Sequence, residues 1–183
     1  LVTGFDIVKQ QIKIAAGEKL AASKKRIKPN GWAIECRINA EDPQENFIPS
    51  PGKIEGYRSP GGIGVRVDSG VFMGFTIPPH YDSLVSKLSV WGQDRKEATA
   101  RMKRALDEYV ILGIKTTLPL YRAIFRENNF IKGVYDTGYI EKHYDELLRI
   151  MDRVRESGKS HDKRLASIFE NNIAFLPVCD AHF

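Results

Sequence analysis

Alternation of apolar and polar residues in residues 33–39 predicts a strand with one buried face. A run rich in Leu and Val at 84–91 predicts a second strand, and shorter β-type runs fall at 53–58, 65–67 and 109–114. In the first strand four apolar residues supply the bulk, while the polar residues alternate toward the other face. The apolar positions are Ala33, Ile34, Cys36 and Ile38, and the polar positions are Glu35, Arg37 and Asn39.

Helical spacing and capping signals predict several helices. Residues 3–6 have the form of a capping box, apolar residues then repeat up to Ala15, and Gly17 is a natural stop. Asp94 and Glu97 open a second helix, and a third spans about 117–127. A fourth begins near Thr137, is predicted to end at 157–160, and precedes a short helix at 163–171. Its heptad-like stripe consists of Ile140, Tyr144, Leu147, Met151 and Val154.

The segment between residues 47 and 79 is dense in Gly and Pro, with short strands between sharp turns. This spacing favours a small, mainly antiparallel sheet with sharp corners. We therefore expect an α+β fold, with a small antiparallel, barrel-sandwich-hybrid-like sheet and flanking helices.

Composition narrows the classes of function. The net charge is +5, but acids are interspersed with most basic residues, and the dense run at 24–28 has the character of a solvated loop. Nucleic acid is therefore not expected as a partner. The apolar runs are too short to cross a bilayer, so no membrane is expected either. The chain begins at Leu1, which suggests a piece of a longer protein.

The cysteines and histidines do not form a metal-binding pattern. Cys36 and Cys179 are far apart, and the four histidines are scattered. No metal site is predicted, and two unmatched thiols are typical of a reducing compartment. We expect a cytoplasmic location, or the mitochondrial matrix in a eukaryote.

Arg37 is the residue most suited to chemistry. A strand presents its planar five-donor fork in a fixed direction, toward a carboxylate, a phosphate or a ureido carbonyl. The structural alternative is an ion pair with Glu35 or Glu41. From the residues alone the chain is an α+β domain without a recognisable catalytic set.

Several long blocks in one order resemble the C-terminal domain of biotin carboxylase. The block at 35–43 reads Glu-Cys-Arg-Ile-Asn-Ala-Glu-Asp-Pro. The others lie at 2–8, 49–54, 60–66, 78–84 and 113–116, so that the resemblance covers about residues 1–145. Residues 146–183 are a helical C-terminal extension by this division.

The resemblance implies that ATP and bicarbonate are used to carboxylate biotin held on a carrier domain. It places Arg37 against the ureido oxygen of biotin as a catalytic and biotin-binding residue, and Asp82 at the border of the same pocket. It places Ile63 and Arg66 at a dimer interface. The alternatives are an Asx turn or cap for Asp82 and a plain exposed strand residue for Arg66, while Lys115 and Thr116 are interpreted as structural.

The resemblance also implies what lies outside this chain. The ATP-grasp residues that hold ATP and Mg²⁺ belong upstream. We therefore expect residues 1–183 alone to be inactive. The implied partners are a biotin carboxyl carrier domain, a carboxyltransferase subunit or domain, and a second copy of the protein. For the extension, packing on the parent domain competes with docking to a carboxyltransferase or carrier partner.

Two other functions remain open. One is the cap domain of another ATP-grasp carboxylase that uses no biotin, and the other is a non-catalytic assembly module of a carboxylase complex. The final carboxyl acceptor (acetyl-CoA, propionyl-CoA, pyruvate or another) is chosen elsewhere.

Overall fold

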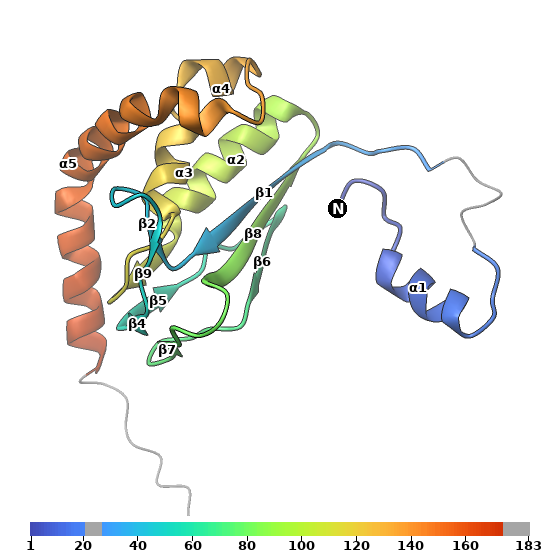
Figure 1. The fold of residues 1–183 in the computed structure, drawn as a ribbon, viewed down its shortest axis with the longest axis horizontal. Helices are drawn as coiled ribbons and strands as arrows, with labels where there is room; N and C mark the ends of the chain where they lie inside the picture. Colours follow the sequence, from blue (N-terminus) through green and yellow to red (C-terminus); the bar gives the residue numbers. More distant parts are fainter. Residues whose placement is uncertain (21–26, 174–183) are drawn as a thin grey trace, which may run out of the picture.

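The computed structural model describes residues 1–20 and 27–173, with only the backbone described for 157–173. Helices and strands are both present, and four helices form a layer beside the strands while α1 lies apart (Figure 1). The elements are α1 Ile7–Ala15, β1 Trp32–Asn39, β2 Glu41–Asp42, β3 Ile48–Pro49, β4 Gly52–Lys53, β5 Gly56–Arg58, β6 Val65–Ser69, β7 Thr76–Ile77, β8 Leu84–Gly92, α2 Arg95–Glu108, β9 Val110–Leu112, α3 Leu118–Ile124, α4 Asn128–Lys132 and α5 Tyr139–Ile173.

All strand pairings in the described residues are antiparallel. β1, β8 and β6 form a sheet in that order, and the other sheets pair β2 with β3, β4 with β7, and β5 with β9. In the larger sheet Cys36 is opposite Leu88, and Arg37 is opposite Lys87. The predicted α+β class with a small antiparallel sheet is therefore confirmed at this level.

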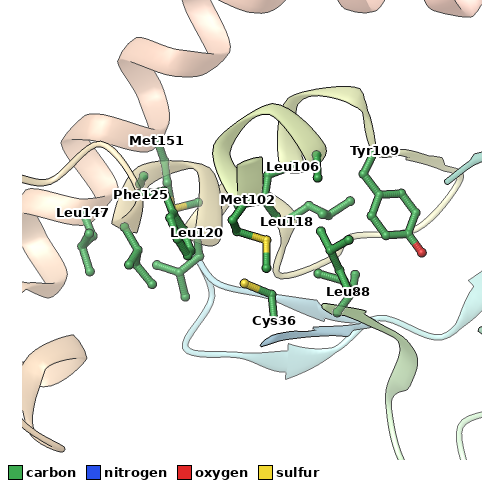
Figure 2. Close-up of a cluster of buried hydrophobic side chains, with 14 of the residues drawn as sticks. Cys36, Leu88, Met102, Leu106, Tyr109, Leu118, Leu120, Phe125, Leu147 and Met151 are labelled. Carbon is green, nitrogen blue, oxygen red and sulfur yellow. The ribbon is translucent and has the colours of Figure 1, made fainter. Parts of the chain in front are cut away.

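One face of the β1–β8–β6 sheet is covered by helices, which bury its apolar residues. α2 packs on β8 and β1, and α3 packs on α5. Figure 2 shows side chains from these helices meeting those of the strands in one cluster. Leu88 and Val90 have no exposed surface, and full burial of such a side chain contributes about 1.5–3 kcal/mol. The cluster includes Cys36, Ile38, Leu88, Val90, Met102, Leu106, Tyr109, Leu118, Leu120, Phe125, Leu147 and Met151.

The first helix begins three residues later than the capping box predicted. Asp6 caps it, because its Oδ1 accepts from the Lys9 amide at 2.9 Å, whereas Thr3 accepts from the Phe5 amide. Asp at the N-cap supplies the same acceptor as the predicted Thr. Gly17 follows the end of the helix with a φ of +88°, as predicted. α1 contains no buried residue, and its apolar face is exposed.

The fourth predicted helix is a single helix, α5, and the predicted stop at 157–160 is wrong. α5 continues through Gly158 and absorbs the separate helix predicted at 163–171. A glycine costs a helix only about 1 kcal/mol relative to alanine, so it does not enforce an end. The apolar stripe packs on the core as far as Val154. Asp145, the predicted domain boundary, lies inside this helix.

The smaller elements were predicted less well. The run at 53–58 is divided into β4 and β5 by Ile54 and Glu55, and residues 109–114 form a strand only at Val110–Leu112. The short strands β2, β3 and β7 and the helix α4 were not predicted. Parts of the chain named earlier, including most of the basic run at 24–28 and Cys179, lie outside the described residues.

Gly113 lies at a close approach between two backbone segments. Its φ is +94°, and a Cβ atom there would be 2.2 Å from the Lys53 carbonyl oxygen and 2.9 Å from the Glu55 nitrogen. Glu55 also donates its amide to the Leu112 carbonyl at 2.9 Å. Only glycine fits this corner, because both the conformation and the space exclude a side chain.

We predict that Gly113→Ala lowers the free energy of unfolding by more than about 2 kcal/mol, because a left-handed conformation and a backbone clash combine. Urea unfolding followed by circular dichroism measures the change. Gly70→Ala is the control, since nothing lies within 4 Å of its added Cβ, and it should cost less than about 0.5 kcal/mol. Equal unfolding midpoints for the two variants would contradict the prediction.

Glu127 links α4 to α5 through a buried carboxylate. It accepts from the Asn129 and Phe130 amides at 2.9 and 2.8 Å and from the Tyr139 hydroxyl at 2.6 Å. Burial acts to raise the pKa of Glu127, but these hydrogen bonds and the nearby His143 outweigh it, so the pKa lies below its usual value. The charged form is therefore the one that stabilises the fold.

We predict that Glu127→Gln lowers stability at neutral pH by about 1–3 kcal/mol, because two amides lose a charged acceptor. A carboxyl with a lowered pKa stabilises the native protein above its unfolded pKa, and the effect disappears as pH falls through the folded pKa. The difference between wild type and variant should therefore shrink as the pH falls below about 4.5, measured by urea unfolding from pH 7 to pH 3. The exposed Glu45→Gln serves as control, and a constant difference across this range would refute the assignment.

Candidate functional site

The face of the β1–β8–β6 sheet that points away from the helices carries charged side chains on all three strands. The strand register puts Glu35, Ser89 and Arg66 in one row across the sheet. Arg37, Lys87 and Asp68 form the next row. We call these six residues the charged face. The alternation of β1 thus buries Cys36 and Ile38 and exposes Arg37, as the sequence predicted.

No carboxylate within residues 27–156 forms an ion pair with the guanidinium of Arg37. The two carboxylates considered as ion-pair partners from the sequence, Glu35 and Glu41, bind other groups. Glu35 accepts from the Ser89 hydroxyl at 3.2 Å, and Glu41 accepts from the Asn39 amide group at 3.0 Å and from the Ser83 hydroxyl. Neither carboxylate considered from the sequence therefore neutralises Arg37.

Lys87 is directly opposite Arg37 and was not identified from the sequence. Like charges in directly opposed positions destabilise a strand pair, so this arrangement is costly without an anion or a polar acceptor nearby. Asp68, on the far side of Lys87, is bound to Arg66 by two contacts of 3.0 Å. The region around Arg37 and Lys87 is thus the positive part of the charged face.

The backbone of Arg37 is held by the start of α3, from about eighty residues further along the chain. Its carbonyl accepts from the Tyr121 hydroxyl at 3.1 Å and the Thr117 hydroxyl at 3.3 Å. Thr117 also accepts from the Asn39 amide at 3.0 Å. Neither residue was identified from the sequence, because local spacing contains no signal for a contact of this range.

Cys36 lies beside Arg37 on the opposite face of β1. Burial, aided by the charge of Glu35, raises the pKa of the Cys36 thiol, so the thiol stays neutral. It acts as apolar bulk under the site, as predicted from its place in the alternation.

Asp82 lies in the turn that leads into β8, near the end of β1. Its Oδ1 accepts from the Leu84 amide at 2.9 Å, which is the Asx-turn geometry considered as its structural role. The next residue, Ser83, donates its hydroxyl to Glu41 and accepts from the Ala40 amide through its carbonyl. Asp82 is thereby fixed, and exposed, beyond the Arg37 end of the strand.

The two residues predicted at a dimer interface are both exposed. Arg66 belongs to the charged face, and the side chain of Ile63 is 91% exposed in the turn before β6. Gly64 allows that turn, since it has a φ of +74° and its carbonyl accepts from the Trp91 amide. Ile63 is thus near the end of β8 opposite to Asp82. Lys115 and Thr116 were interpreted as structural. Lys115 donates its amide to the Ser50 hydroxyl at 3.0 Å, and Thr116 is buried.

A cavity of about 1090 Å³ opens elsewhere, between α2, α3, α5 and the β2 and β9 regions. None of the four predicted site residues lines it. Several of its cations are already bound, such as Arg126 to Asp107 and Arg104 to Glu108. We therefore place the candidate site on the open charged face and not in this cavity.

The described residues contain no cluster of three or more His, Cys, Asp or Glu side chains that could hold a metal ion. In the same part of the chain, no helix has the length and apolar character needed to span a bilayer.

The comparisons with known proteins agree on one family. The model described as "Biotin carboxylase C-terminal domain" matches residues 35–142. A pyruvate carboxylase subunit of Methanothermobacter thermautotrophicus is 53% identical over 169 residues, which are 92% of this chain and 34% of that protein. Biotin carboxylase 1 of Bacillus subtilis is 50% identical over 143 residues, 78% of this chain and 32% of that protein.

A solved structure gives the same result. It is the biotin carboxylase domain dimer of Hydrogenobacter thermophilus 2-oxoglutarate carboxylase, in complex with MgADP, ADP and bicarbonate. The TM-score is 0.77 at 49% identity, covering 80% of this chain and 32% of that one. This chain therefore spans about a third of the length of these relatives.

Proposed function

The chain belongs to the biotin carboxylase C-terminal domain family, and from this membership we propose that it supplies one wall of the biotin site in an ATP-dependent biotin carboxylase. The observation that carries the proposal is Arg37, whose backbone carbonyl is held by Thr117 and Tyr121 and whose guanidinium has no ion-pair partner in the described residues. In this function bicarbonate, activated by ATP, provides the carboxyl group. Biotin on a carrier domain accepts that group at N1. Residues for ATP and Mg²⁺ belong to the part of such an enzyme that this chain does not cover.

Arg37 performs an electrostatic role in this proposal. When biotin loses the proton on N1, negative charge moves to the ureido oxygen, and a guanidinium fixed beside that oxygen stabilises the charge where it develops. The strand matters because it sets the direction of the Arg37 side chain before the reaction, so that little reorganisation is needed during it. Lys87 strengthens the positive field from across the strand pair, and Asp82 borders the pocket.

The proposal includes the assembly and the finer architecture. We assign Ile63 and Arg66 to a homodimer surface, supported by their exposure and by the dimeric form of the similar solved structure. The four small sheets form a barrel-sandwich-like unit in this proposal. Ala40 bonds both to Ser83 before β8 and to Ser50 after β3, and the adjacent Ile54 and Glu55 bond to Phe75 before β7 and Leu112 in β9. A cytoplasmic location fits the neutral, unpaired thiol of Cys36.

The extension belongs to the assembly of the carboxylase in this proposal. The match to the Methanothermobacter thermautotrophicus relative spans 169 of the 183 residues. Wherever this match begins, it includes residues 15–169, and it therefore includes much of α5. The family model ends at residue 142. We therefore assign α5 beyond Glu156 to docking of the partner subunit that carries biotin or the carboxyltransferase.

We predict that Arg37→Ala, in the carboxylase subunit that contains this chain, lowers biotin carboxylation by about 100- to 1000-fold, since it removes one transition-state contact. The KM for ATP should stay within about twofold, because Arg37 does not touch ATP in this proposal. The rate is measured as ATP- and bicarbonate-dependent carboxylation of a biotinylated carrier domain. A carrier with an unmodified lysine is the substrate control.

Arg58→Ala is the matched protein control, because Arg58 is another exposed strand arginine. Full activity of Arg37→Ala would overturn the role of Arg37. Equal ATP turnover with the biotinylated and the unmodified carrier would instead favour a carboxylase that uses no biotin, and no turnover with either would favour an assembly module.

We predict that deletion of residues 157–183 weakens binding of the partner subunit by at least about 10-fold and leaves carboxylation of free biotin unchanged. The cut must spare Leu147 and Met151, which are buried in the core, so deletion from Asp145 is unsuitable. Binding is measured by titration of the partner subunit, with size-exclusion chromatography as a check on folding. Unchanged binding would contradict the docking role.

A further inference from the structure

Thr117 occupies the N-cap position of α3 but does not cap that helix. It has no side-chain hydrogen bond to the first turn, although a threonine there is usually worth about 1 kcal/mol as a cap. Its hydroxyl instead accepts from the Asn39 amide at 3.0 Å and donates to the Arg37 carbonyl at 3.3 Å. The Thr117 amide also donates to the Asn39 carbonyl at 3.0 Å. The side chain is thus engaged across the fold, on both sides of Ile38.

Tyr121, one turn further along α3, completes the contact. Its hydroxyl donates to the same Arg37 carbonyl at 3.1 Å. Burial, the largest effect, raises the pKa of Tyr121 to about 12, so the hydroxyl remains a proton donor throughout the physiological range. Two independent side chains therefore converge on one backbone oxygen.

The contact lies where β1 most needs support. β1 is an edge strand in the order β1–β8–β6, so groups on its outer edge have no neighbouring strand to bond. The pairing with β8 is also irregular here, with a register shift between Ile38 and Asn39. A bulge redirects the side chains next to it. The strand end that carries Arg37 is thus the part of β1 least fixed by the sheet itself.

We propose that Thr117 and Tyr121 are positioning residues for Arg37, which hold its backbone so that the guanidinium points at the substrate carbonyl. The proposal rests on the function proposed above for Arg37. Displacing a catalytic group by about 1 Å can cost 100-fold in rate. The loss of two hydrogen bonds to the Arg37 carbonyl therefore acts on catalysis without either residue touching substrate.

The test uses the carboxylase subunit that contains this chain, with free biotin, ATP and bicarbonate as substrates. Thr117→Val removes the hydroxyl at nearly constant shape, and Tyr121→Phe removes the second donor. We expect kcat/KM for biotin to fall about 10-fold for Thr117→Val and more for the double variant, with the KM for ATP within about twofold. Thr117→Ser keeps the hydroxyl and should restore most of the activity. Tyr144→Phe is the matched control, because Tyr144 also donates to a backbone carbonyl, that of Pro43, but from α5.

A double-mutant cycle separates positioning from a general structural role. In an Arg37→Ala background, Thr117→Val and Tyr121→Phe should cause no further loss, since their effect passes through Arg37. An equal loss with and without Arg37, or no loss in the single and double variants, would overturn the positioning role. If Arg37→Ala itself has no effect, the proposed function fails instead, so the two failures are distinguishable. If Thr117→Val does not fold, Tyr121→Phe decides the question, because it removes one donor to the Arg37 carbonyl: a loss that depends on Arg37 is expected, and no loss would overturn the role.

Discussion

The register between β1 and β8 is the constraint on which the rest of the structure depends. It sets Cys36 against Leu88 inside the core and Arg37 against Lys87 outside it. A shift of one residue would reverse every side chain of the strand, burying a guanidinium and exposing the apolar set. The helices that cover one face therefore enforce the chemistry of the other, because burial of Leu88, Met102 and Leu106 allows a single register.

The parts of the site that depend on alternation could be predicted from the sequence, and the long-range parts could not. Arg37 and Cys36 were assigned to opposite faces correctly, since a strand repeats every two residues. Thr117 and Tyr121 could not be related to Arg37, because the contact spans 80 and 84 positions. The exposure of Arg66 was likewise considered from the sequence, but its place in the same sheet as Arg37 follows only from the strand order.

The same distinction between local and long-range signals explains which helices and strands could be predicted from the sequence. β1, β8 and α2 are long and strongly patterned, and their predicted cores agree with the structure. β2, β3 and β7 each have two residues, too few to show any period. Gly158 was interpreted as a stop because glycine often ends helices, but α5 passes through it. Leu147 and Met151 anchor the first half of α5 in the core. This packing outweighs the weak tendency of a glycine to end the helix.

The separation of the two faces of β1 also affects how such a protein can evolve. Substitutions at Glu35, Arg37 or Lys87 leave the packed residues beneath them untouched, so their cost in stability is small. The outer layer of this sheet can therefore change while the packed scaffold stays constant. A lineage can alter the charge of one face through a few side chains, with no need to redesign the interior.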